Sequence, residues 1–530
     1  MIRQKSKKPT LIDLFCGCGG FSSGMIDAGF DCIAAVDMDE AAITTFQEAH
    51  PNVKHVLQRN LSSFWPSDLS KIIGLQKVDV IVGGPPCQGF SKARQADGSN
   101  HGANPTPDDR RELYKDFLRY VKFFKPKVFV MENVPGIKTA VGGKFFTKIQ
   151  ADSRALGYRV VPFEVKAWRY GVPQKRIRQL IIGTPADLPY FIPEHQIVAT
   201  HALPTDDDYE ILEPYVSLGE AIGDLPPVRK LDARFFREYD QGRLKKHLSV
   251  FGERYVFDVL RVNKSKLITG HFCRAHSERD LRDFARLKEG ETSKHAIARG
   301  VKMEFPYDRE NFKDRYTRQS RSELCSTIVA HLKRDGLMYI HPTQNRSLSP
   351  REAARIQSFP DTFPLPSVQS YAYQQIGNAF PPLVAKAVGI GIKSYLRKCP
   401  QRVAKKKTKA ITLPKTRNKA ISFIETFIES VCMERLIEEV PKKEFIQVWA
   451  AITAVHPQLH PDSALKPGRE ISPGPKRGVS LILEPFYIES GWPVELIPVA
   501  VEARRRFQRG ELLIDDYYCS HAIELAYQAR

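Results

Sequence analysis

The first forty residues alternate apolar runs with a glycine-rich turn. Residues 10–14 and 31–36 are short apolar segments, and the stretch between them, "FCGCGGFSSGMIDAGF", combines clustered glycines with helical spacing of its apolar positions. Short apolar runs bounded by glycine are typical of buried strands. We therefore predict a strand, a glycine-rich turn, an amphipathic helix, a second strand and an acidic end within residues 10–40. This is the opening of an α/β fold with a parallel sheet.

The same pattern continues further along the chain. Apolar segments at 78–86 and 126–134 each predict a buried strand that runs into a loop, and the helical segment 110–124 lies between them. A further strand is predicted at 178–185. Residues 1–187 thus have the pattern of one Rossmann-like domain.

Beyond residue 187 the pattern changes, which divides the rest of the chain. Residues 188–340 have weak periodicity and predict a smaller, mixed domain. Residues 341–395 include "SPREAARIQSFP", which predicts a helix with a Ser N-cap and Pro at its first position. Residues 396–420 are rich in Lys and Arg and predict a solvated linker. Residues 421–530 predict a separate, mainly helical domain.

Charge and cysteine content narrow the class of protein. The 530 residues contain 80 Lys and Arg against 60 Asp and Glu, a formal net charge of +20, which favours a polyanionic partner such as nucleic acid. The nine cysteines are scattered and odd in number, which favours a reducing compartment. No segment approaches the roughly 20 apolar residues that span a bilayer, and no signal peptide is apparent. We expect a soluble cytoplasmic protein without a membrane partner.

The glycine-rich turn indicates a ligand. Gly17, Gly19 and Gly20 allow close approach of backbone to a ligand at a helix N-terminus, and Asp37 ends the next strand about 20 residues later. An acid at that place suits the two hydroxyls of a ribose. The spacing favours an adenosine-bearing cofactor over a dinucleotide, and a plain tight turn is the alternative.

Two strand ends carry candidate chemistry. Cys87, in "GGPPCQGFS", follows a predicted strand at the carboxyl edge of the sheet, and Pro85 and Pro86 stiffen its approach. A positioned thiol is a candidate nucleophile, although a lone cysteine is more often a packed core residue. Glu132 ends the next strand at the same edge, so its carboxyl can reach the same cleft as a proton donor or merely cap a helix.

Basic side chains follow in "QKRIRQ". Gln174, Arg176 and Arg178 alternate along an extended segment, so their side chains point to the same side. The two cations could depress the pKa of a neighbouring thiol and hold a phosphate or a base edge.

Metal-ligand patterns are weak. Cys16 and Cys18 are separated by one residue and lack a second pair, and His271, Cys273 and His276 have an unusual spacing for zinc. We expect no metal site.

The motifs taken in order resemble a known family. "DLFCGCGGFSSG", "VDMDE", "GGPPCQGFS", "MENV", "QKRIRQLIIG", "REAARIQSFP" and "QQIGNAFPP" resemble the motif series of bacterial DNA cytosine-5 methyltransferases. The resemblance covers about residues 10–395 and implies that residues 341–395 form the C-terminal part of the catalytic domain. It implies S-adenosylmethionine as methyl donor and, as acceptor, a cytosine flipped out of a specific duplex DNA sequence.

The resemblance also implies residue roles. Cys87 resembles the nucleophile that adds to cytosine C6, Glu132 the acid at N3, and Arg178, with Arg176 nearby, the arginine that helps to hold the base. The residues that resemble the cofactor site are Phe15, Gly17, Gly19, Gly20, Phe21, Asp37, Met38, Asn60, Pro85 and Asn378. Asn60 departs from the family, which has an acidic residue near the adenine amine.

The resemblance leaves alternatives open. Residues 88–109 resemble the loop that closes over the flipped base, and residues 188–340 occupy the place of the target recognition domain. The basic content of that domain favours duplex DNA, with RNA as an alternative substrate and a non-catalytic DNA-binding relative as another. A restriction endonuclease is a possible partner in a defence system.

Overall fold

The computed structural model describes residues 8–86, 112–189, 191–228, 236–265, 267–305, 316–334, 336–399 and Trp449. Met1–Pro185 and Phe191–Lys398 belong to one compact unit, and the other residues are assigned to a second. The elements described below all belong to the first unit. Cys87, the predicted closing loop 88–109, most of the predicted linker and nearly all of the predicted C-terminal domain lie outside the described residues.

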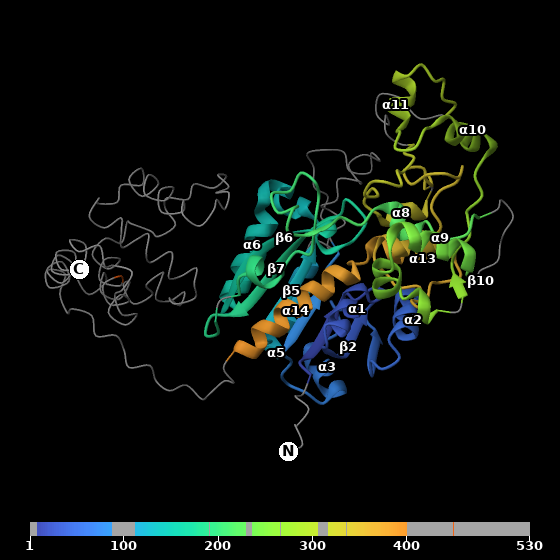
Figure 1. Ribbon diagram of the computed structural model, residues 1–530. Helices are drawn as coiled ribbons and strands as arrows, with labels where there is room; N and C mark the ends of the chain where they lie inside the picture. The colour runs from blue at the N-terminus through green and yellow to red at the C-terminus, as the bar shows by residue number, and fades with distance from the viewer. Residues whose placement is uncertain are drawn as a thin grey trace, which may run out of the picture. The chain divides into compact units, whose positions relative to one another are not determined.

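A seven-stranded sheet forms the centre of the first unit (Figure 1). Its strand order is β3-β2-β1-β4-β5-β7-β6. The strands are β1 Thr10–Leu14, β2 Asp31–Asp37, β3 His55–Gln58, β4 Val80–Gly83, β5 Val128–Asn133, β6 Tyr158–Lys166 and β7 Ile177–Pro185. The pairs β1–β2, β2–β3, β1–β4 and β4–β5 are parallel, whereas β7 is antiparallel to both β5 and β6.

The antiparallel β7 corrects the expectation of a parallel sheet. The sequence predicts strands at β1, β2, β4, β5 and β7, and all five exist. It does not show that β6 and β7 form a hairpin added to the edge of β5, because an apolar run does not encode its direction. The hairpin matters for function, since it places the beginning of β7 at the carboxyl edge of β5.

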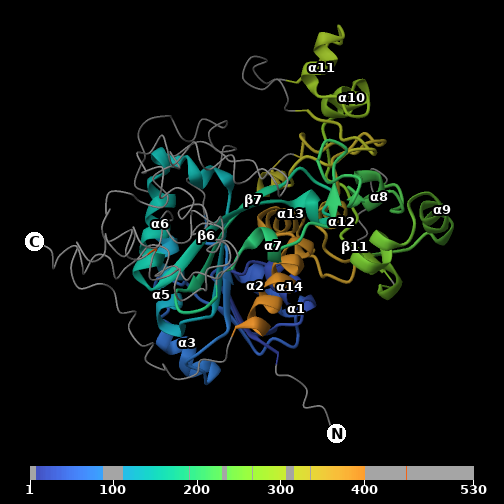
Figure 2. The same cartoon turned by 60° about the vertical axis from the view of Figure 1, so that its left-hand side comes forward.

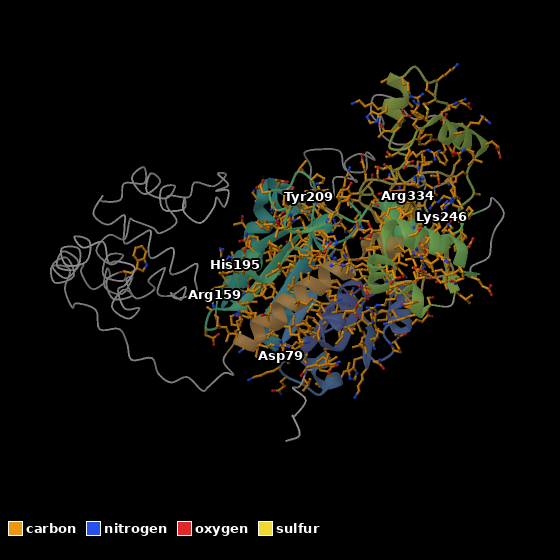
Figure 3. All side chains as sticks on the ribbon, viewed as in Figure 1. Asp79, Arg159, His195, Tyr209, Lys246 and Arg334 are labelled. Carbon is orange, nitrogen blue, oxygen red and sulfur yellow. The ribbon has the colours of Figure 1, made fainter. Side chains whose placement is uncertain are left out.

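Asp79 aligns the opposite, amino edge of the sheet. It precedes β4, and its Oδ2 accepts a hydrogen bond from the backbone N–H of Thr10 at the start of β1, at 3.0 Å. Its Oδ1 lies 3.0 Å from Nζ of Lys127, the residue before β5. These contacts lower the pKa of Asp79 although partial burial alone would raise it. Three strands therefore start in register around the residue labelled in Figure 3.

Helices cover both faces of the sheet. Figure 2 shows α1 and α14 on one side and α3, α5 and α6 on the other. The helices of this part are α1 Gly20–Asp27, α2 Glu40–Ala49, α3 Pro66–Ile73, α5 Leu113–Phe124, α6 Lys144–Ala155, α7 Pro193–Gln196, α12 Pro350–Ile356, α13 Gln369–Asn378 and α14 Pro382–Lys398. Its short 3₁₀ helices are Pro135–Lys138, Ala140–Gly143 and Ala167–Tyr170. The apolar core of the sheet domain lies between the sheet and α5.

Residues 191–340 contain shorter elements, as their weak periodicity predicts. They comprise β8 His201–Ala202, β9 Glu213–Pro214, α8 Leu218–Ile222, β10 Phe236–Glu238, α9 Gln241–Phe251, a π-helix at Arg254–Val259, a 3₁₀ helix at Val262–Lys264, β11 Leu267–Thr269, α10 Glu278–Arg286, α11 Ser293–Ala298 and a 3₁₀ helix at Ala330–Lys333. Helices α10 and α11 project at the top of Figure 1 and share a small core of their own.

Helix α12 joins this region to the sheet domain, and all its residues are buried. Ser349 caps it, and Glu352 completes the capping box. Glu352 also accepts two hydrogen bonds from the Arg346 guanidinium, at 2.7 and 2.8 Å. Burial alone would raise the pKa of Glu352, but Arg346 outweighs it and the pKa is lowered. An apolar core that includes residues of α8, α12 and α13 packs around α12 and connects residues 191–340 to the sheet domain.

Candidate active site

The glycine-rich turn lies where the strand order reverses. β1 has β2 on one side and β4 on the other, and ligands of open α/β sheets bind outside the carboxyl ends at such a point. The backbone N–H of Gly17 donates to Asp37 Oδ2 at 2.8 Å, and Asp39 N–H donates to Asp37 Oδ1 at 2.9 Å. Burial raises the pKa of Asp37 above its usual value. The acid at the end of β2 is thus fixed against the turn.

The surface beside Asp37 fits an adenosine. Gly17 has φ +53°, and a Cβ built on it would meet no atom within 4 Å, so the turn faces open space. Met38 is 65% exposed, an unusual position for a large apolar side chain that suits packing against a base. Asn60 is also exposed and accepts Ser62 N–H through Oδ1 at 3.0 Å. Phe15 holds a positive φ of 57° at the start of the turn.

A segment far along the chain, around residue 380, packs against this turn. A Cβ on Gly20 would lie 2.4 Å from the backbone oxygen of Phe380, so only glycine allows this approach. The rings of Phe21 and Phe380 are 4.7 Å apart between centroids. Asn378, two residues earlier at the end of α13, is exposed. The segment that follows Asn378 therefore packs on α1, beside the predicted cofactor residues Gly20 and Phe21.

Gly19 has a different reason to be glycine. It has φ +91°, and a Cβ there would lie 2.8 Å from the Phe46 ring and 2.9 Å from His50. Gly19 lets α1 begin close to α2. Its contribution to a cofactor site is through the backbone path and not through open space.

A carboxylate and a guanidinium meet at the carboxyl edge of β5. Arg178 Nε lies 2.7 Å from Glu132 Oε1, and the two side chains are 12% and 15% exposed. A Cβ built on Gly84 would be 3.0 Å from Glu132 Oε2, so this carboxylate lies against the segment that leads to Cys87. Pro85, the next residue, is buried. The antiparallel hairpin brings Arg178 to this edge.

The three side chains of "QKRIRQ" have different partners. Arg178 contacts Glu132, as described. Arg176 is 1% exposed and donates to the backbone oxygens of Ile328 at 2.7 Å and Ala379 at 2.9 Å. These contacts give Arg176 a positioning role and leave Arg178 as the arginine beside the predicted acid. Gln174 is fully buried.

Helix α5 holds the loop that carries Asn60, which the sequence did not reveal. Ser62 donates to Asp116 Oδ2 at 2.7 Å, Tyr120 donates to the backbone oxygen of Phe64 at 2.9 Å, and Arg119 donates to the Leu61 carbonyl. Asp116, Arg119 and Tyr120 are three and four residues apart and so lie on one helix face. This spacing is present in the sequence, but it is too common in helices to indicate a contact with the Asn60 loop.

The residues considered for zinc make ordinary hydrogen bonds. His271 Nδ1 lies 2.9 Å from Ser349 Oγ, and its Nε2 lies 2.7 Å from the Pro226 oxygen. His276 Nε2 lies 3.0 Å from Ser347 Oγ. Within the described ranges, no group of three or more His, Cys, Asp or Glu side chains is arranged to hold a metal.

None of the described helices has the length and apolar character to cross a membrane.

The sheet topology and the glycine turn against Asp37 define a Rossmann-like α/β fold with a ligand site at the carboxyl ends of its strands. The chain belongs to the C-5 cytosine-specific DNA methylase family, whose model matches residues 10–394. It is therefore an enzyme of the DNA cytosine-5 methyltransferase class, and the predicted family, fold class and enzyme class are confirmed.

Known proteins of this kind resemble most of the chain. It is 34% identical over 401 residues to the type II methyltransferase M.DdeI of Desulfomicrobium norvegicum, covering 73% of this chain and 88% of the relative. It is 31% identical over 434 residues to M.AgeI of Thalassovita gelatinovora, covering 72% and 98%. A solved E. coli structure described as a prophage-encoded DNA modification methyltransferase matches with a TM-score of 0.56 and 27% identity, covering 74% of this chain and 100% of that one.

Proposed function

We propose that this enzyme transfers a methyl group from S-adenosylmethionine to C5 of a cytosine that is flipped out of a specific duplex DNA sequence. The observation that carries the proposal is the Glu132–Arg178 pair at the carboxyl edge, with Glu132 Oε2 against Gly84, three residues before Cys87. A nucleophile and a proton donor from adjacent strands can thereby act on one base.

The residues around the turn fit the methyl donor. The open space at Gly17, the fixed Asp37 carboxylate and the exposed Met38 suit an adenosine. Asn378, two residues before the Phe380 that packs on Phe21, is proposed to complete the site. S-adenosylmethionine, when bound, supplies an activated methyl group. The chain's own task is to bind the adenosine and to orient the donor toward the base.

The reaction begins with covalent addition. The Cys87 thiolate forms a bond to cytosine C6, and Glu132 donates its proton, or a hydrogen bond, to N3 as negative charge develops there. Arg178 holds the Glu132 carboxyl in place. The addition makes C5 enamine-like and nucleophilic. After C5 carries the methyl group, water takes up the C5 proton, and the electrons of that C–H bond restore the C5–C6 double bond and expel the Cys87 thiolate from C6. N3 returns its proton to Glu132.

Duplex DNA is the proposed partner. The net charge of +20 favours a polyanion, and residues 188–340 would grip phosphates and read base edges as a target recognition domain. The matched relatives are named type II methyltransferases, which supports a role as the modification enzyme beside a restriction endonuclease. Such a role places the protein with the DNA in the bacterial cytoplasm.

A mechanism-based trap tests the chemistry. Duplex DNA with 5-fluorocytosine at the target should form a denaturation-stable adduct with the wild-type enzyme and S-adenosylmethionine, because fluorine cannot leave as the C5 proton does. The Cys87→Ala variant should form none. An enzyme that methylates the unmodified duplex but forms no adduct would contradict attack at C6, and methylation of RNA alone would contradict the DNA substrate.

A further inference from the structure

The end of the predicted target recognition domain is bound to the entrance of β7. The backbone N–H of Cys325 donates to the Pro173 oxygen at 3.0 Å, and the N–H of Lys175 donates to the Cys325 oxygen at 2.8 Å. The N–H of Ile328 donates to the side-chain Oε1 of Gln174 at 3.1 Å. Residues 325–328 therefore follow the backbone that leads directly to Arg178.

Two buried glutamines extend this contact to the segment that carries Asn378. Gln174 Nε2 donates to Gln357 Oε1 at 2.6 Å and to the Ile356 oxygen at 3.0 Å. Gln357 Nε2 in turn donates to the backbone oxygens of Ile376 at 2.8 Å and Ala379 at 3.3 Å. Both glutamines are 0% exposed. We call Gln174 and Gln357 the glutamine pair.

Arg176 forms a second connection between the same segments. Its guanidinium donates to the Ile328 oxygen at 2.7 Å and to the Gly377 oxygen at 3.3 Å. Ile328 is thus held at its N–H by Gln174 and at its oxygen by Arg176. The two segments also touch directly, because a Cβ built on Gly377 would lie 2.3 Å from the backbone nitrogen of Ala330.

These contacts form one continuous buried network. A shift of residues 325–328 cannot leave the carbonyls of Ile376 and Gly377, just before Asn378, in place without breaking buried hydrogen bonds. Unsatisfied buried amides are costly, so the two segments must move together. The backbone of Gln174 and Arg176 leads into β7, on which Arg178 pairs with Glu132.

We propose that the glutamine pair couples DNA recognition to cofactor binding. The proposal rests on the function proposed above. When residues 325–328 take their DNA-bound position, Gln174 and Gln357 transmit that position to the carbonyls beside Asn378 and stabilise the closed cofactor site. Gln174 and Gln357 are positioning residues, since neither contacts a reacting atom.

The test measures the coupling and not the activity. Binding of S-adenosylhomocysteine to the full chain is measured by calorimetry, with and without a duplex that carries the sequence the enzyme methylates. Coupled sites typically change each other's affinity by about 5–150-fold, and we expect the wild-type protein to fall in this range. In Gln174→Leu we expect the ratio of the two dissociation constants to fall to about 1, while both ligands still bind.

A neighbouring surface contact provides the matched control. Gln374 lies on α13, which ends at Asn378, and its Oε1 accepts a hydrogen bond from Lys333 Nζ at 2.7 Å at an exposed position. Gln374→Leu should keep the wild-type ratio. The double variant Gln174→Leu, Gln357→Leu should lose no more coupling than Gln174→Leu alone, because the pair acts as a unit.

Two results would overturn the coupling proposal. One is a wild-type ratio of the two dissociation constants in Gln174→Leu, and the other is an equal loss of coupling in Gln374→Leu. If Gln174→Leu does not fold, judged by near-ultraviolet circular dichroism, Gln357→Leu replaces it and the same two results apply. Failure of the wild-type protein to bind either ligand would instead contradict the proposed function.

Discussion

Two residues of similar backbone conformation distinguish a ligand site from a simple turn. Gly17 and Gly74 have φ of +53° and +67°, and a Cβ on either would meet no atom within 4 Å. Gly17 faces the predicted cofactor, whereas Gly74 ends α3. We expect either change to alanine to destabilise the free protein by about 1–2 kcal/mol.

The two variants should differ when ligand is added. In Gly17→Ala the new methyl group occupies the space of the ligand, so S-adenosylhomocysteine should no longer raise the unfolding temperature. In Gly74→Ala the increase should equal that of the wild-type protein. Thermal unfolding with and without ligand measures both, and a normal response of Gly17→Ala would place the cofactor elsewhere.

The predicted acid can be tested against a surface ion pair. Glu132→Gln keeps the shape of the side chain but cannot give up a proton as a carboxylic acid does, so kcat should fall by roughly 10²–10⁴-fold. Glu164 pairs with Lys138 at 3.1 Å and is 38% exposed, and Glu164→Gln should leave kcat near the wild-type value. Steady-state methyl transfer to DNA measures both variants. Comparable kcat values for the two would remove Glu132 from the proposed mechanism.

At the residue scale the sequence identified positions better than contacts. Asp37 and Gly17 could be placed together because the strand, turn, strand order brings them to one edge. Arg176 could not be separated from Arg178, because its partners are backbone oxygens of Ile328 and Ala379, and a backbone acceptor leaves no trace in the sequence.

The junction of β1 and α1 should respond to pH. Asp13, on β1, is 1% exposed, and Ser22 Oγ on α1 donates to its Oδ2 at 2.6 Å. Burial raises the pKa of Asp13 to about 7. The folded state therefore retains a proton that the unfolded state has released, and stability falls as pH rises from about 4 to about 7.

Asp13→Asn isolates this contribution. It removes the ionisation and keeps an oxygen that accepts from Ser22. Over this pH range the free energy of unfolding of the wild-type protein should fall, relative to the variant, by up to about 1.4 kcal/mol per pH unit. Denaturant titrations of both proteins at several pH values measure it. Parallel pH profiles would show that Asp13 is not protonated in the folded protein.

Five of the seven strands of the sheet were predicted, and β3 and β6 were not. The strands β1, β2, β4, β5 and β7 are short apolar runs, and each was predicted. β6 was missed because Arg159, Glu164 and Lys166 interrupt its apolar pattern, and its pairing with β7 depends on a long-range contact. The direction of β7, which determines the site, followed from neither propensity nor pattern.

At the scale of the whole molecule, methyl transfer should require only the first unit. α14 ends at Lys398, and the family model matches residues 10–394. The matches to M.DdeI and M.AgeI include 88% and 98% of those proteins but only 73% and 72% of this chain. A fragment that ends at residue 399 should keep kcat within about threefold of the full chain, since it loses no proposed catalytic group. An insoluble or inactive fragment would show that later residues are needed.

The predicted domain boundaries stay predictions. The change of composition near residue 187 and the basic segment after 395 suggested boundaries, and one compact unit does end at Lys398. The predicted recognition domain shares this unit with the sheet, because buried contacts such as Arg176 to Ile328 and Arg355 to Asp224 cross between them. Sequence composition cannot reveal such contacts.

The most direct test of the account is bisulfite sequencing of DNA from a methylation-free bacterial host that expresses the full chain, beside the same host expressing Cys87→Ala. We expect 5-methylcytosine in one short sequence context with the wild-type protein and none with the Cys87→Ala variant. Methylation that persists in the Cys87→Ala host would contradict the proposed role of Cys87. Unmethylated DNA in a host where the wild-type protein is folded and binds S-adenosylmethionine would contradict the proposed methylation of DNA.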